Sequence, residues 1–242
     1  MIKIDKPIAM QDQYNYLSNV TIAEAKIIQQ QLAEKVCTQD HINKVATVAG
    51  TDVGFEQGGK ITRAAVVILS FPALELIEYS ISRCPTTFPY VPGYLSFREC
   101  PALLEALSKI KQQPDLLLCD GQGIAHPRRM GIACHLGLLT GIPSIGVAKS
   151  RLIGTHEVVG EEKGCWQPLY DRKGDDNDEV IGAVLRTRTG VKPLYISPGH
   201  NISLPTAIHY VQACLTRYRL PETTRWADGI ASNRPAFMRR IN

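Results

Sequence analysis

The order of secondary-structure patterns between residues 44 and 148 constrains the fold more than any other feature. Residues 44–55, 61–70 and 74–82 are rich in β-branched side chains and alternate between apolar and polar positions, which is typical of strands. No helical pattern separates these three stretches, so we expect a sheet that begins antiparallel. The segments 115–120 and 143–148 are short and almost wholly apolar, as expected for strands buried on both faces. Together, the five segments predict a mixed β-sheet.

Helical patterns surround the later strands. Residues 21–36 open with a capping box, Thr21 and Glu24, and carry apolar side chains at helical spacing. Further helices are predicted at 102–111, 130–141 and 203–218, further strands at 179–188 and 192–197, and an exposed hairpin tip at 174–179. We therefore expect an α/β protein, a single domain over residues 1–242, with helices on both faces of the sheet. This order matches a ribonuclease H-like fold better than a Rossmann fold, which would need a glycine-rich turn after its first strand.

The composition of the chain argues against several classes of protein. Of its 242 residues 44% are hydrophobic, which is enough to form a large core. No apolar run reaches transmembrane length, and residues 1–13 lack the pattern of a signal peptide, so we expect a soluble, cytoplasmic protein with no membrane partner. The seven cysteines include no CxxC pair, which argues against a disulfide framework and against a zinc ribbon.

The positive charges of the chain are clustered. The net charge is only +4, which permits an anionic partner without requiring one. Basic residues gather in four short segments, 126–130, 148–152, 186–192 and 237–240. Each segment alone is typical of a solvated surface, but together they favour a nucleic-acid partner.

Two aspartates belong to strands that should be buried. Asp52 lies inside the first predicted strand, and Asp120 follows the apolar run 115–119 at the end where open α/β sheets place ligands. A buried carboxylate needs a partner, so each either accepts backbone hydrogen bonds in a turn or binds a metal ion. If the two strands are neighbours, the aspartates converge, and with Glu99 as a third acid they favour Mg²⁺. Near a cationic surface, such a site indicates phosphodiester hydrolysis.

Other hydrolytic chemistries lack their motifs. His126 and His135 are too far apart in sequence for the usual zinc-ligand spacings, and HExxH is absent. There is also no GxSxG segment for a serine hydrolase.

Five segments, in this order and at this spacing, resemble the endonuclease V family, the deoxyinosine 3′ endonucleases. They are TDVGF at 51–55, PYVPGYLSFRE at 89–99, DGQGIAHPRR at 120–129, GVAKSRL at 146–152 and SPGHNISLPTA at 197–207. The resemblance spans roughly residues 20 to 235. It implies a ribonuclease H-like fold and a DNA-repair endonuclease that depends on Mg²⁺, for which Mn²⁺ can substitute. It also implies a cut at the second phosphodiester bond 3′ of deoxyinosine, leaving 3′-hydroxyl and 5′-phosphate ends.

The resemblance assigns metal ligands. Asp52 and Asp120 correspond to direct ligands, and Glu99 to a third acid that acts directly or through water. Asp228 falls where the family has its last acidic or imidazole group, and a carboxylate there suits Mg²⁺.

Three more residues have catalytic or supporting roles by the same resemblance. His126 would hold a metal-bound water or act on the leaving group, with a loop histidine bonded to backbone as the alternative. Lys149 would steady the scissile phosphate or the attacking water. For His200, support of the metal ligands and a structural cap for the following helix stay equally open.

Recognition of the lesion requires the base to leave the stack. Hypoxanthine lacks the 2-amino group of guanine, so a tight pocket lined by backbone could exclude guanine by shape. Glycines permit that close approach, and Gly93, Gly121 and Leu95 are our candidates for the lining, with Gly131 as a weaker one.

The loop before Gly93 is stiffened by two prolines. Pro89 and Pro92 bracket Tyr90 and Val91, so little entropy is lost when the loop enters DNA. We expect Tyr90 and Val91 to form a wedge that fills the gap left by the flipped nucleotide. The alternative is that Tyr90 packs on a neighbouring protein surface.

Two other functions stay open. One is an inosine-specific ribonuclease acting on single-stranded RNA, because the sequence does not reveal the role of a 2′-hydroxyl. The other is a non-cleaving nucleic-acid binder on the same fold, which would not need all four acidic groups. The expected partner is DNA containing deoxyinosine, with inosine-containing RNA as the alternative, and we expect a monomer.

Overall fold

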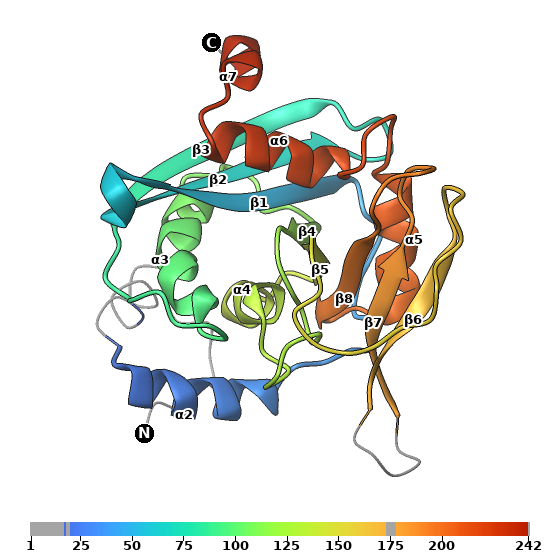
Figure 1. Ribbon diagram of the computed structural model, residues 1–242. Helices are drawn as coiled ribbons and strands as arrows, with labels where there is room; N and C mark the ends of the chain where they lie inside the picture. The colour runs from blue at the N-terminus through green and yellow to red at the C-terminus, as the bar shows by residue number, and fades with distance from the viewer. Residues whose placement is uncertain (1–16, 18–19, 173–177, 242) are drawn as a thin grey trace.

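A single eight-stranded sheet runs through the molecule. The computed structural model describes residue 17 and residues 20–172 and 178–241, and its strands follow the order β3-β2-β1-β4-β5-β8-β7-β6. Figure 1 shows helices on both faces of this sheet. The order of the first five strands is the ribonuclease H-like arrangement that the sequence predicts.

Three antiparallel strands form one half of the sheet. They are β1 (Thr47–Glu56), β2 (Ile61–Ser70) and β3 (Leu76–Pro85), with a short 3₁₀ turn, η1 (Gln57–Gly59), between the first two. Most β2 side chains are buried. The predicted antiparallel start is therefore confirmed.

The central strands run parallel to β1. β4 (Leu116–Cys119) pairs with β1, and β5 (Ser144–Ala148) pairs with β4; both are buried along their whole length, as the apolar runs predict. The antiparallel strands β8 (Leu194–His200), β7 (Glu179–Leu185) and β6 (Trp166–Asp171) complete the sheet.

Each face of the sheet has its own group of helices. One core joins the sheet to α2 (Ile22–Ala33), α3 (Leu95–Ser108) and α4 (Ile132–Thr140). The opposite core contains α5 (Leu204–Ala213), α6 (Glu222–Ala231) and α7 (Pro235–Ile241). In Figure 1, α6 lies over β1 and β2, while α3 and α4 lie on the other side and α2 lies beyond α4.

Several elements differ from the sequence prediction. Helix α3 begins at Leu95 and continues through Pro101, because its buried face extends back to Phe97. Helix α5 ends at Ala213, short of the predicted end at residue 218. In the loop that follows, Arg219 donates to the carbonyls of Lys149, Lys192 and Pro193.

Three elements were not predicted, and one prediction is only partly covered. Strand β6 contains Pro168, which is tolerated because β6 is an edge strand. Helix α6 is rich in threonine and contains Gly229, so its local propensity is weak; α7 was also missed. Most of the predicted hairpin tip at 174–179 lies outside the described residues.

Across the described residues, every helix falls short of the length and apolarity needed to cross a bilayer.

Candidate active site

Two neighbouring parallel strands bring Asp52 and Asp120 together. Thr51 of β1 is in register with Cys119 of β4, and the backbone N–H of Asp120 donates to the carbonyl oxygen of Thr51 over 3.0 Å. Asp52 is the next residue after Thr51, and Asp120 is the next residue after Cys119. The predicted convergence of the two carboxylates at this edge of β4 is therefore observed.

Helix α6 adds the third aspartate. It lies so close to β1 that a Cβ on Gly50 would meet the carbonyl oxygen of Thr223 at 2.0 Å, and one on Gly54 would meet that of Ala231 at 2.6 Å. This contact carries Asp228, which is 6% exposed, to the end of β4. Carboxylate oxygens of Asp52, Asp120 and Asp228 all lie within 4.8 Å of one another.

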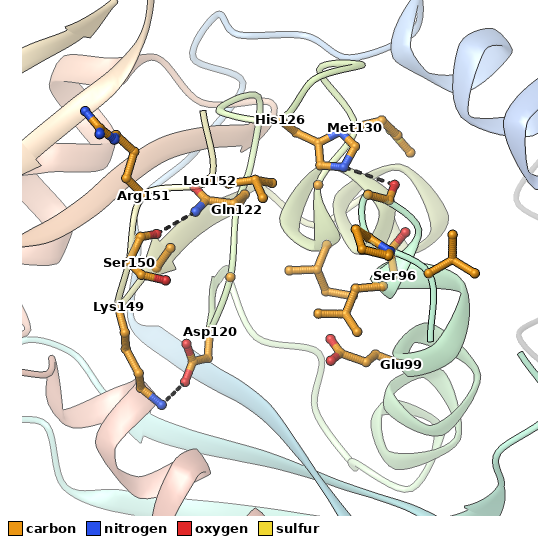
Figure 2. A pocket seen from close by; sticks show the side chains of 18 of the residues that line it. Ser96, Glu99, Asp120, Gln122, His126, Met130, Lys149, Ser150, Arg151 and Leu152 are labelled. Atoms are coloured by element: carbon orange, nitrogen blue, oxygen red, sulfur yellow. Dashed lines mark hydrogen bonds and ion pairs between the residues drawn. The ribbon is translucent and has the colours of Figure 1, made fainter. Parts of the chain in front are cut away.

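Lys149, just after β5, places a cation among these acids. Its Nζ pairs with Asp120, as Figure 2 shows, and lies 2.9 Å from Oδ1 of Asp228. Burial opposes the charge on Lys149, but the carboxylates, above all that of Asp120, raise its pKa overall. Arg234 approaches the other oxygen of Asp228 at 2.7 Å. The cluster thus already holds positive charge between two of its three carboxylates.

Burial, and after it the closeness of the other carboxylates, disfavours the charged form of these acids. Burial and the charge of Asp120 raise the pKa of Asp52 to about 8. Burial also raises the pKa of Asp120, although Lys149 opposes the shift. Glu99 on α3 is 6% exposed, and burial followed by the charges of Asp52 and Asp120 raises its pKa well above the usual range. Carboxylates in this state are stabilised by a nearby cation.

The donor set fits a magnesium ion. Among the described residues, the group of close ligand atoms consists of the three aspartates alone, with no imidazole or thiolate. Hard carboxylate oxygens are the ligands that Mg²⁺ prefers. Asp52, Asp120 and Asp228 would hold the ion. Glu99 does not belong to this close group, but lies beside it on the wall of the adjoining cavity.

A cavity of about 400 Å³ adjoins the acids. Its walls come from the proline loop, the loop after β4 and the segment after β5, and all four predicted base-pocket residues line it: Gly93, Leu95, Gly121 and Gly131. Figure 2 shows Asp120 and Lys149 on one side of this space and Glu99 and Ser96 on the other. Gly121 has φ +147°, and a Cβ there would meet Cγ2 of Ile132 at 2.6 Å, so the wall requires glycine at this position.

The proline loop presents its tyrosine to solvent. Tyr90 is 72% exposed, which argues against the alternative that it packs on a protein surface. Tyr90, Val91 and Pro92 line the mouth of the cavity. Behind them, Phe88 is buried against Phe97 with ring centroids 5.5 Å apart. An exposed tyrosine on a loop anchored by a buried phenylalanine is the form expected of a wedge. Pro89, the fourth predicted wedge residue, does not line the cavity.

His126 uses both ring nitrogens inside the protein. Its Nδ1 accepts from the backbone N–H of Arg128 over 3.2 Å, so Nε2 carries the proton and donates to the carbonyl oxygen of Gly93 over 3.1 Å. Burial, followed by the charge of Arg128, lowers its pKa to about 4. This arrangement favours the alternative of a loop histidine bonded to backbone, at the rim of the cavity.

The structure does not bring His200 to the acids. It pairs with Ser144 at the start of β5, whereas Lys149 follows the other end of that strand. Its Nδ1 accepts from the backbone N–H of Cys37 over 3.1 Å, and Ser203 caps α5. His200 therefore anchors the chain before β1, away from the site.

One basic segment is used internally rather than for nucleic acid. Arg129 pairs with Asp171 and lies 2.7 Å from Glu179, and Arg128 bonds to Gln29 and Gly93. Arg128 and Arg129 are therefore already paired within the protein, while the prediction that the four basic segments together favour a nucleic-acid partner stays a prediction.

A family model described as endonuclease V matches residues 30–229. The endonuclease V of Rippkaea orientalis is 60% identical over 214 residues, covering 88% of this chain and 91% of that protein. The chain belongs to the endonuclease V family. It is accordingly a hydrolytic endonuclease, and the family resemblance that its motifs carry is confirmed.

Solved endonuclease V structures share its fold. That of Streptomyces avermitilis superposes with a TM-score of 0.82 at 37% identity, covering 93% of this chain and 96% of that one. That of Ciona intestinalis, in complex with a 24mer DNA containing an inosine followed by a ribo-adenosine, has a TM-score of 0.74 at 29% identity and covers 91% of this chain and 99% of that one. The predicted ribonuclease H-like fold is thus confirmed for this endonuclease V.

Some site residues escaped the sequence prediction. Arg234, which pairs with Asp228, carries no local signal. Gln29 does carry a sequence signal, because it is a polar residue four positions after Ala25 and so lies on the apolar face of the predicted helix. In the structure, Gln29 is 0% exposed.

Proposed function

We propose that the protein is a DNA-repair endonuclease specific for deoxyinosine. It hydrolyses the second phosphodiester bond 3′ of the lesion and leaves 3′-hydroxyl and 5′-phosphate ends. The reaction depends on Mg²⁺, for which Mn²⁺ substitutes, and the enzyme works as a monomer in the cytoplasm. The observation that carries this proposal is the aspartate triad, with oxygens within 4.8 Å, beside a glycine-walled cavity.

The acids and Lys149 support the hydrolytic step. When bound, a divalent cation polarises the scissile phosphate and makes water a better nucleophile. Asp52, Asp120 and Asp228 would hold the ion. Lys149, which pairs with Asp120 and Asp228, would offer its positive charge to the phosphate beside these carboxylates.

The cavity supports recognition of a flipped base. Its walls include backbone at Gly93 and Gly121, both with positive φ, and Leu95, which is 41% exposed, offers an apolar surface for a ring. A wall of backbone accepts hypoxanthine and excludes the 2-amino group of guanine by shape. Tyr90, which lines the cavity and is largely exposed, would fill the gap left in the DNA helix.

The ribonuclease alternative shares this site. The Ciona intestinalis relative was crystallised with an inosine followed by a ribo-adenosine, which keeps open a role for a 2′-hydroxyl. The non-cleaving binder is disfavoured, because a pure binder has no need of three converging aspartates and a buried Glu99.

The test is cleavage of a DNA duplex with one deoxyinosine, compared with the same duplex carrying deoxyadenosine at that position. We expect nicking of the inosine strand with Mg²⁺ and none with a chelator. Ends that DNA ligase can reseal would identify the 3′-hydroxyl and 5′-phosphate. Competition by inosine-containing RNA at the same salt concentration distinguishes the ribonuclease, since salt alone changes affinity strongly. Binding without cleavage in Mg²⁺ would refute the proposal.

A further inference from the structure

Three hydrogen-bond donors converge on one carbonyl oxygen at the base of the proline loop. The oxygen of Gly93 accepts from Nε2 of Gln29 over 2.9 Å, from Nε2 of His126 over 3.1 Å and from Nη2 of Arg128 over 2.6 Å. A carbonyl oxygen has two lone pairs, and three donors fully occupy them. The carbonyl of Gly93 is therefore held more firmly than that of a loop residue with one donor. The three donors come from two segments far apart in sequence.

Gln29 connects this oxygen to helix α2. Its side chain is fully buried, and Nε2 also donates to the carbonyl oxygen of Met130 over 3.3 Å. Its Oε1 accepts from Nε of Arg128 over 2.5 Å. One amide therefore links α2 to the proline loop and to the loop that follows β4, and a buried amide with these bonds fixes all three segments.

Arg128 completes the connection. Its guanidinium bonds to Gln29 through Nε and to Gly93 through Nη2, and it lies over the ring of Tyr94 at 4.2 Å from the centroid. Gly93 has φ +81°, and a Cβ there would meet Nη2 of Arg128 at 2.9 Å. The positive φ favours glycine at this position, and a side chain there would also crowd the guanidinium of Arg128.

We call the hydrogen bonds from Gln29 and Arg128 to the carbonyl oxygen of Gly93 the clamp. The clamp lies between the wedge residues of the proline loop and the helix that carries Glu99. Gly93 follows the wedge residues directly and precedes α3, which carries Glu99. Neither Gln29 nor Arg128 lines the cavity, so both act through Gly93 rather than on a substrate. A loop fixed before binding loses less entropy when DNA arrives.

We propose that Gln29 and Arg128 are positioning residues that set the lesion-probing loop in its binding conformation. The role in lesion recognition rests on the proposed function, while the clamp itself is a property of the free protein. Two kinds of measurement are therefore needed, one without DNA and one with it.

The central variant is Gln29→Met, which keeps the length of the side chain and removes its hydrogen bonds. Gln30→Met is the matched control, because Gln30 is the exposed neighbour on the same helix. Leu32→Ala, at a buried apolar position of α2, is a second control that loosens the helix without touching Gly93.

The measurement without DNA is amide hydrogen exchange at Tyr94, whose N–H donates to the carbonyl oxygen of Val91 over 3.0 Å. We expect Gln29→Met to accelerate this exchange at least about tenfold. Gln30→Met should leave it unchanged, and Leu32→Ala should change it only as far as its global stability falls. Unchanged exchange in Gln29→Met would overturn the clamp, whatever the protein does to DNA.

The measurement with DNA determines KM and kcat separately for each variant, with the duplex that contains deoxyinosine as the substrate. We expect Gln29→Met to raise KM about tenfold while kcat changes less than threefold, since the clamp does not touch the reacting atoms. Adding Arg128→Met should then cost little more, because both side chains act on the same carbonyl. Faster exchange with an unchanged KM would overturn the positioning role. If Gln29→Met exchanged faster but the wild-type protein did not cut inosine DNA, the clamp would be supported and the proposed function would be refuted.

Discussion

Lys149 Nζ lies 2.9 Å from Oδ1 of Asp228, so a cation from the end of β5 is held by a carboxylate from α6. The same ammonium pairs with Asp120 after β4. This relationship ties three separate elements together at the edge of the sheet. A metal ion bound by these carboxylates would therefore compete with Lys149 for Asp120 and Asp228.

The first prediction concerns Lys149→Met. We expect cleavage to fall about 100-fold, because the charge offered to the phosphate is lost. The melting temperature of this variant should rise more on addition of Mg²⁺ than that of the wild type, since the competing cation is gone. Lys109→Met, which removes an exposed lysine paired with Glu105, is the control and should change neither quantity. Equal responses to Mg²⁺ in Lys149→Met and wild type would argue against the competition.

Asp120→Asn tests the metal ligands. The substitution keeps the volume of the side chain and removes its charge, so we expect Mg²⁺-dependent nicking to fall by at least about 100-fold while the circular dichroism spectrum is unchanged. Asp178→Asn, at a half-exposed surface carboxylate, is the matched control and should nick normally. Nicking by Asp120→Asn at near the wild-type rate would show that the site is assigned wrongly.

Glu99→Gln tests the strain in the acid cluster. The folded protein binds a proton on Glu99 at a pH where the unfolded chain has released it, because burial and the neighbouring aspartates raise its pKa well above 4.5. The free energy of unfolding of the metal-free protein should therefore fall as the pH rises through this interval. At pH 7.5, Glu99→Gln should be about 1–3 kcal/mol more stable than the wild type without metal, yet less active.

Thermal melts between pH 5 and pH 8 measure this effect. The loss of stability with rising pH should be smaller in Glu99→Gln, and a remaining part should come from Asp52, whose pKa is raised from 3.8 to about 8. A variant that melts at the same temperature as the wild type across the whole range would rule out strain at Glu99.

Tyr90 offers a test of the wedge. Tyr90→Ala should weaken binding of the inosine duplex by about 1–3 kcal/mol, because stacking on the bases is lost. The melting temperature should stay the same, since Tyr90 is 72% exposed. Tyr90→Phe keeps the ring and should bind almost normally. If both variants kept wild-type affinity and selectivity, Tyr90 would not be a wedge.

The central part of the fold follows from local patterns, because the segments of β4 and β5 are short, almost wholly apolar and buried, as expected for strands covered on both faces. Asp52 and Asp120 meet because β4 pairs with β1, a pairing that the sequence alone could supply only as a condition. Asp228 is different, since α6 has weak helix propensity and its close approach depends on Gly50 and Gly54 lacking a Cβ. Only the family resemblance could place that residue in the site.

The hydrogen bonds of loop residues could not be predicted. The basic run at 126–130 suggested contacts with nucleic acid, but the side chain of Arg128 turns inward to Gln29 and Gly93. Which way a loop arginine points depends on partners distant in sequence, here on α2. Similarly, the direction in which His126 uses its two nitrogens depends on the backbone of Gly93 and Arg128.

The position of the cut is the sharpest test of the proposed activity. A duplex with one deoxyinosine, labelled at either end of the lesion strand, reports which bond is broken when Mg²⁺ is added. We predict a single product, cut at the second phosphodiester bond 3′ of the inosine, with no product from the adenosine duplex. A cut at another bond, or equal cutting of the adenosine duplex, would contradict the account.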